Sequence, residues 1–147
     1  MKKYIKHVLL LTLFLNLGFS QSKVAIQDKE IQLNENEAVI EVLGMVCSMC
    51  AFGIGEGFAK TDFIDKSKFN DGVMVDIDAQ YVQLALNKSS NVNPENIVKV
   101  IEEAGYDVNA LFILQDKKLT KFSFDKLGIL QPMAFNQASD QKYSLAN

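Results

Sequence analysis

The chain has 147 residues, of which 48% are hydrophobic and 22% charged, and its formal net charge is −3. This length and composition fit one modest globular domain with flanking segments. An acidic chain that contains no arginine is a poor partner for phosphate backbones, so we expect no binding to nucleic acid.

Residues 1–20 have the features of an export signal. Three lysines stand among the first six residues, an apolar run spans residues 8–17, and small residues precede a cleavage position after Ser20. The run is shorter than the roughly 20 residues that cross a bilayer. We therefore expect a soluble periplasmic or secreted protein, with a retained N-terminal anchor as the alternative. Removal of the three lysines takes the formal charge from −3 to −6.

The same cleavage removes His7, which is the only histidine of the chain. The expected mature protein then has no imidazole for Ser-His-Asp or Cys-His catalysis, and none for a Cys/His zinc site. We therefore expect a protein that is not an enzyme.

The mature chain begins with a polar, mixed leader over residues 21–37, in which a short strand lies at 24–26 or at 31–33. Three kinds of local signal predict the elements that follow. Apolar and β-branched residues with period-two alternation indicate strands, and Asn93-Pro94 and Gly105 mark helix boundaries. They are a strand over 38–43, a helix from Cys50 to about Lys60, a hairpin of strands 73–77 and 81–86, a helix ending at Gly105, and a strand over 107–114.

This order of elements predicts the fold class. Strand, helix, strand, strand, helix and strand over residues 38–114 are typical of an α+β, ferredoxin-like sandwich, in which two helices cover one face of a four-stranded antiparallel sheet. Residues 115–147 form a C-terminal extension of unknown role, and we expect its apolar stretch 121–130 to pack on the domain.

The only two cysteines, Cys47 and Cys50, lie between the first strand and the first helix. A helix N-terminus favours thiolate over thiol, and thiolates bind soft metal ions. Two sulfurs without an imidazole favour Cu(I) or Hg(II), whereas Zn(II) needs four ligands. A structural disulfide across so short a loop removes little chain entropy. The pair therefore predicts a metal site, with redox exchange and a passive disulfide as alternatives.

The segment Gly44-Met45-Val46-Cys47-Ser48-Met49-Cys50 resembles the Gly-Met-x-Cys-x-x-Cys signature of heavy-metal-associated domains, the family of copper chaperones and periplasmic mercury-binding proteins. Ile54 and Glu102-Glu103-Ala104-Gly105-Tyr106 extend the similarity over about residues 38–114. The resemblance implies that Cys47 and Cys50 are the metal ligands. It also implies that Met45 lies in the core under the loop and that Tyr106 shields the sulfurs.

Three features depart from the family pattern. Val46 replaces the usual threonine or serine, the first helix contains three glycines, and the segment between that helix and Val73 is longer than usual. We expect the glycines to allow close helix packing. We expect Met49 to pack in the core or the loop, with a third metal ligand as its alternative role.

The resulting hypothesis is an exported protein that captures one soft ion between Cys47 and Cys50 and transfers or sequesters it. Cu(I) is the first expectation, and Hg(II) or Zn(II) are alternatives. A metal transporter or another metal-accepting protein is the expected partner, and a metal-bridged homodimer is a further option. Chaperone, scavenger and sensor remain open.

Two other functions remain open as well. The first is periplasmic thiol-disulfide exchange by the same cysteines, although such enzymes usually have an aromatic residue where this chain has Val46. The second is a binding module whose C-terminal segment recruits a partner.

Overall fold

The computed structural model describes residues 22–124 and 128–134. Within residues 37–115 the elements follow the predicted order, and each predicted strand of this part lies within one residue of its expected bounds. They are β3 (Glu37–Leu43), α2 (Ser48–Ala59), β4 (Val73–Asp76), β5 (Tyr81–Ala85), α3 (Pro94–Glu103) and β6 (Asp107–Gln115). The four strands pair antiparallel in the order β4-β5-β3-β6, which confirms the ferredoxin-like fold.

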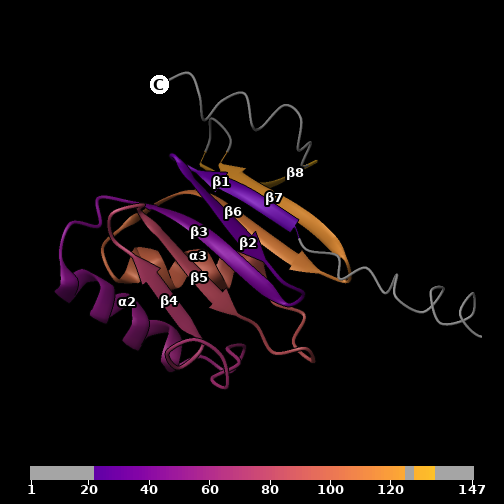
Figure 1. Cartoon of the computed structure of the whole chain (residues 1–147), viewed down its shortest axis with the longest axis horizontal. Helices are drawn as coiled ribbons and strands as arrows, with labels where there is room; N and C mark the ends of the chain where they lie inside the picture. Colours follow the sequence, from indigo (N-terminus) through magenta and orange to yellow (C-terminus); the bar gives the residue numbers. More distant parts are fainter. Residues whose placement is uncertain (1–21, 125–127, 135–147) are drawn as a thin grey trace, which may run out of the picture.

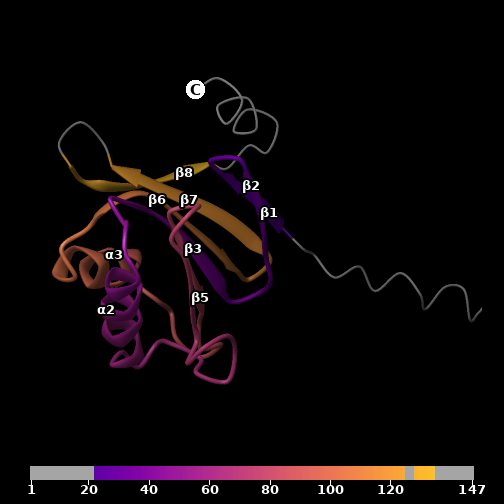
Figure 2. The same ribbon diagram turned by 60° about the vertical axis from the view of Figure 1, so that its left-hand side comes forward.

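Both helices lie on the same face of this sheet (Figures 1 and 2). The local sequence explains α3 directly, because the side chain of Asn93 accepts a hydrogen bond from the backbone N–H of Glu95 and Pro94 occupies the first turn. Apolar residues of both helices then meet the inner face of β3 in the main core. The fully buried helical members of this core are Ile54, Phe58, Ile97 and Ile101.

The sheet is two strands larger than predicted. β7 (Lys118–Phe124) pairs with β6, and β8 (Leu130–Ala134) pairs with β7, so the sheet has six strands in the described part of the chain. The turn into β7 uses Asp116 and Lys117, both at positive φ (53° and 60°). This conformation is usually signalled by asparagine or glycine, so the sequence contained no clear hairpin signal.

The opposite face of the sheet is covered by a hairpin of β1 (Ser22–Ile26) and β2 (Lys29–Leu33), as Figure 2 shows. The leader was predicted to hold a strand at one of these two places, and the structure has both. Their buried residues form a second core with the outer face of the sheet. The hairpin and sheet members of this core include Val24, Ile26, Ile31, Leu33, Val39, Tyr81, Phe112 and Leu114.

Since both faces are covered, consecutive residues of β3 are buried in opposite directions. Val39 faces the second core and Ile40 the main core, and each has an exposed fraction of 0%. A strand buried on both faces has a continuous apolar run in place of alternation. No helix of the described residues is long and apolar enough to cross a membrane.

A buried carboxylate joins β3 to two other parts of the fold. Glu37 is 2% exposed, and its carboxylate accepts hydrogen bonds from the backbone N–H of Asn34 (2.9 Å) and from Nε2 of Gln83 in β5 (3.0 Å). Nζ of Lys68, in the segment before β4, lies 3.4 Å away. Burial of a charge is tolerated when hydrogen bonds and a counter-charge compensate it, as they do here.

We predict that Glu37→Ala lowers the free energy of unfolding by about 2–3 kcal/mol. The backbone N–H of Asn34 loses its acceptor, and the buried amide of Gln83 keeps only the carbonyl oxygen of Gln32. Glu103→Ala is the matched control. Glu103 is 66% exposed, and within residues 22–124 and 128–134 its ion pair is with Lys99 on the helix surface, so its loss should cost less than about 0.5 kcal/mol. Urea unfolding measures both, and equal losses in the two variants would contradict the prediction.

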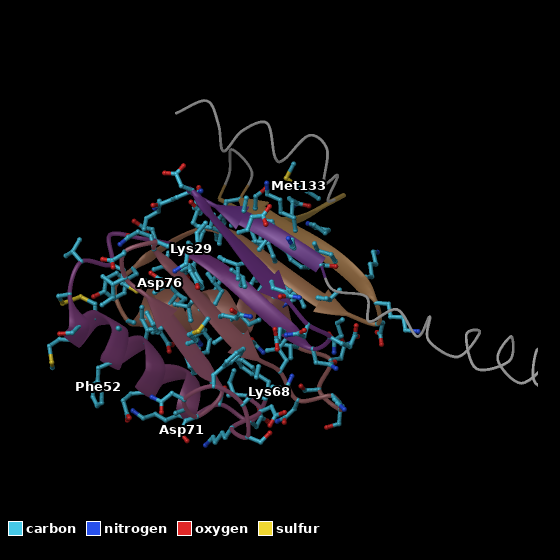
Figure 3. All side chains as sticks on the ribbon, viewed as in Figure 1. Lys29, Phe52, Lys68, Asp71, Asp76 and Met133 are labelled. Atoms are coloured by element: carbon cyan, nitrogen blue, oxygen red, sulfur yellow. A yellow bond between two sulfur atoms is a disulfide. The ribbon has the colours of Figure 1, made fainter. Side chains whose placement is uncertain are left out.

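The covering hairpin is tied to β4 by an ion pair between Lys29 and Asp76, which lie together in Figure 3. The hydrogen bond from Lys29 and a second one from the backbone N–H of Ala79 hold the pKa of Asp76 below its usual value. A carboxyl group with a lowered folded-state pKa adds stability above its unfolded pKa of about 4, and this stability is lost as the pH falls through the folded-state pKa.

We therefore predict that Asp76→Asn destabilises the protein most near neutral pH. Its difference from the unsubstituted protein in free energy of unfolding should shrink below about pH 4, where the carboxyl group becomes protonated. Urea unfolding at a series of pH values measures this difference. Asp107→Asn, at an exposed position at the start of β6, is the matched control for the loss of one surface carboxylate. A pH-independent difference for Asp76→Asn would contradict the prediction.

Candidate metal centre

The cysteines lie in the connection between β3 and α2. Gly44, directly after β3, has a positive φ of 82°, which turns the chain at low conformational cost. The helix begins at Ser48, two residues earlier than predicted, because Cys47 itself acts as its N-cap. Cys47 has an extended backbone, and its sulfur accepts a hydrogen bond from the backbone N–H of Cys50 at 3.3 Å.

This cap brings the two sulfurs together at the helix N-terminus. Cys47 and Cys50 form a disulfide, and their Cα atoms are 5.3 Å apart. Cys47 is exposed, whereas Cys50 is half-buried and packs against the main core. The first turn of α2 contains no acidic residue that would offset the partial positive charge of the helix end. After reduction, this end of the helix therefore favours thiolates.

Met45 holds the loop against the sheet. Its side chain is fully buried, and its backbone N–H donates a hydrogen bond to Oε1 of Gln80 at 3.0 Å. Nε2 of Gln80 donates to the carbonyl oxygen of Met45 and to the carbonyl oxygen of Ile77. Gln80 lies in the turn between β4 and β5, with a positive φ of 55°. The sequence analysis missed Gln80, since a polar residue in a turn is ordinary.

Tyr106 lies directly before β6. It follows Gly105, whose φ is 88°, and its backbone N–H donates to the carbonyl oxygen of Ile101 at 3.2 Å. Its side chain is half-buried against the main core. Shielding of the sulfurs by Tyr106 therefore stays a prediction.

Met49 differs from its prediction, and the predicted close packing of the helix glycines is found at one position only. Met49, expected to pack, is 73% exposed, and Val46 is 81% exposed, because both lie on the outer side of the loop and first turn. Close helix packing is found at Gly57, where an added Cβ would lie 3.0 Å from Cγ1 of Val100. Gly53 and Gly55 have open space at that position, so close packing does not explain them.

The donor set suits a soft ion of low coordination number. Among the described residues, no group of three or more histidine, cysteine, aspartate or glutamate side chains is placed to hold a metal ion. Two sulfurs at a helix N-terminus are sufficient for near-linear coordination of Cu(I) or Hg(II). Zn(II) would need two further ligands from water or a second molecule.

No protein-family model and no curated protein sequence matches the chain. Among solved structures, the chain is similar to the CopZ metallochaperone, with 22% identity over 49% of this chain and 97% of that chain and a TM-score of 0.42. It is also similar to the yeast copper transporter domain Ccc2a, with 24% identity over 54% and 96% of the two chains and a TM-score of 0.42.

Proposed function

We propose that this chain is an exported protein that binds one soft metal ion, Cu(I) in the first place, between Cys47 and Cys50, and transfers or sequesters it. The observation that supports the proposal is the pairing of both sulfurs at the N-terminus of α2, in a loop that Gln80 holds to the sheet. The ion is cargo, so no catalytic residue is required.

Binding requires the reduced pair. A thiol reductant supplies two electrons and two protons to the Cys47–Cys50 disulfide and is itself oxidised to a disulfide. Cu(I) then displaces both thiol protons and is held by two thiolates. Protonated thiols bind metal poorly, so affinity should rise with pH until both sulfurs are thiolates.

Transfer follows from the low coordination number. Cys47 is exposed, so a thiolate of a metal-accepting partner can add to Cu(I) as a third ligand. One of the two original sulfurs then leaves, and the ion passes on without being released to water. A second copy of this chain would add its own thiolate to Cu(I) in the same way, and the product would be a metal-bridged homodimer.

Thiol-disulfide exchange by the same pair is the second candidate. The disulfide itself favours it, together with the cap geometry, since a sulfur that accepts a hydrogen bond at a helix N-terminus is a good leaving group. Such enzymes usually also have a proline that faces the cysteine pair, whereas Pro94, one of the two prolines of the chain, is used to begin α3. We therefore rank this candidate below metal binding.

We predict that the reduced protein binds one equivalent of Cu(I) in competition with a chromogenic Cu(I) chelator, and that Cys47→Ser and Cys50→Ser each abolish this competition. Ser48→Ala, between the two cysteines, is the matched control and should bind as the parent does. Met49→Leu should also retain the stoichiometry if two sulfurs are sufficient. Disulfide reductase activity without competition for Cu(I) would reverse the ranking of the two functions.

Export is a second part of the proposal, and it rests on the sequence of residues 1–20, which lie outside the described residues. We predict that the protein recovered from the periplasm or medium of a bacterial host begins at Gln21, as intact mass and N-terminal sequencing would show. Lys2→Glu with Lys3→Glu should delay processing, because the positive start of the signal is lost. Recovery of the uncleaved chain from the cytoplasm would contradict export.

A further inference from the structure

An apolar groove of about 520 Å³ lies between α2 and the neighbouring strand β4. These two elements run side by side in Figure 1. Three large side chains on the groove remain exposed, namely Phe52 (63%), Phe69 (44%) and Met74 (36%). Phe52 projects from α2 away from the sheet in Figure 3. Exposed apolar surface of this kind is costly in water and marks interaction sites.

The strand that borders the groove is an edge of the sheet. In the described residues the only strand that pairs with β4 is β5, although the N–H of Val73 donates to the carbonyl oxygen of Asn70 at 3.0 Å. The carbonyl oxygen of Gly72 accepts a hydrogen bond from the N–H of Ala85 on β5 at 2.9 Å, so the backbone of Gly72 faces β5. Every second residue of an antiparallel strand bonds to its partner strand, and Val75 lies three residues after Gly72. Its N–H and carbonyl groups therefore point away from β5. The groove therefore has an open backbone edge at Val75.

The rim of the groove is preformed. Phe69 has a φ of 51°, a strained conformation for a bulky residue, so the surrounding structure must hold it there. Gly72 closes the same loop through a 2.7 Å hydrogen bond from its N–H to the carbonyl oxygen of Lys68. An added Cβ at Gly72 would lie 2.8 Å from the carbonyl oxygen of Asp65, so only glycine fits.

Charge and position indicate what the groove would bind. Its charged lining residues are Glu56, on α2, and Asp71, in the loop before β4, and both are acidic. Apolar side chains with a basic neighbour would complement this lining. Ala51 and Phe52 line the groove and directly follow Cys50, so a bound segment would lie beside the cysteine pair.

We propose that this groove docks an extended, basic and apolar segment of the protein that exchanges metal with this chain, and that the segment adds a strand to the free edge of β4. This inference rests on the proposed metal-binding function. Main-chain hydrogen bonds to β4 would supply affinity, and alternate apolar side chains would pack on Phe52 and Phe69. A second copy of this chain is disfavoured as occupant, since it would bring two pairs of Glu56 and Asp71 together.

The test uses the peptide acetyl-Lys-Val-Lys-Val-Lys-Val-Lys-amide and the ¹⁵N-labelled mature protein. We expect amide NMR shifts that centre on Val75 and the outer side of α2. Phe52→Ser should weaken binding about tenfold, as loss of an aromatic anchor does. Met133→Ser, which removes a side chain 50% exposed in β8, is the matched control and should bind as the parent does.

Two further arms test the mode of binding. A peptide with glutamate in place of lysine should not bind, and neither should one with N-methylated central valine, which cannot donate to the strand edge. Shifts that are absent or that lie elsewhere would overturn the proposal, and so would an unchanged peptide affinity in Phe52→Ser. So would sedimentation showing that the protein alone forms a dimer that Phe52→Ser dissociates.

Cu(I) titration of the same samples separates this inference from the proposed function. Phe52→Ser and the parent should compete equally with the chelator, because Phe52 is not a ligand. Cu(I) binding without peptide binding overturns the docking groove alone. Peptide binding by a protein that does not bind Cu(I) overturns the identity of the partner, and with it the proposal.

Discussion

The position of the cysteine loop depends above all on the side-chain amide of Gln80. Its oxygen and nitrogen bond both backbone groups of Met45, and its nitrogen also reaches the carbonyl oxygen of Ile77. A loop that leaves a strand and enters a helix otherwise has free backbone groups and alternative paths. The amide joins this loop to the β4–β5 turn, so the positions of the sulfurs depend on the sheet as well as on the helix.

The sheet in turn is stiffened from both sides. Helices cover one face and the β1–β2 hairpin the other, so β3, which leads directly into the cysteine loop, is buried in both directions. The Lys29–Asp76 ion pair ties the hairpin to β4, and β4 also borders the groove beside α2. A covered sheet has fewer local openings than one with a solvated face, which favours a cysteine pair held ready for an ion.

The sequence predicted the parts of this fold in which local signals agree. Strands β3 to β6 combine periodicity with clear boundaries, and α3 has both a cap and a proline at its start. The additional strands could not be predicted in the same way. β7 follows an Asp116-Lys117 turn without glycine or asparagine and is only half-buried, and β8 contains Pro132. Their pairing depends on contact with β6, which is a tertiary effect.

The candidate site shows the same division. The Cys-x-x-Cys spacing and the strand before it were sufficient to place both sulfurs at a helix start, although the helix begins earlier because Cys47 is its cap. Gln80 lies 30 residues beyond Cys50 in the chain, and its role depends on a turn that folds back under the loop. A pairing over such a separation leaves no local pattern that single-sequence reasoning can use.

The exposed residues around the pair complete the physical picture. Val46 and Met49 beside the sulfurs and Phe52 one turn further on form an apolar margin from the loop along α2. A scavenger that holds its ion indefinitely gains nothing from such a surface, and its exposure promotes association. A protein that must meet a partner at its metal site does gain from it, because apolar contact near the ligands holds the two sites together during ligand exchange. The margin therefore favours transfer over sequestration as the role of the proposed site.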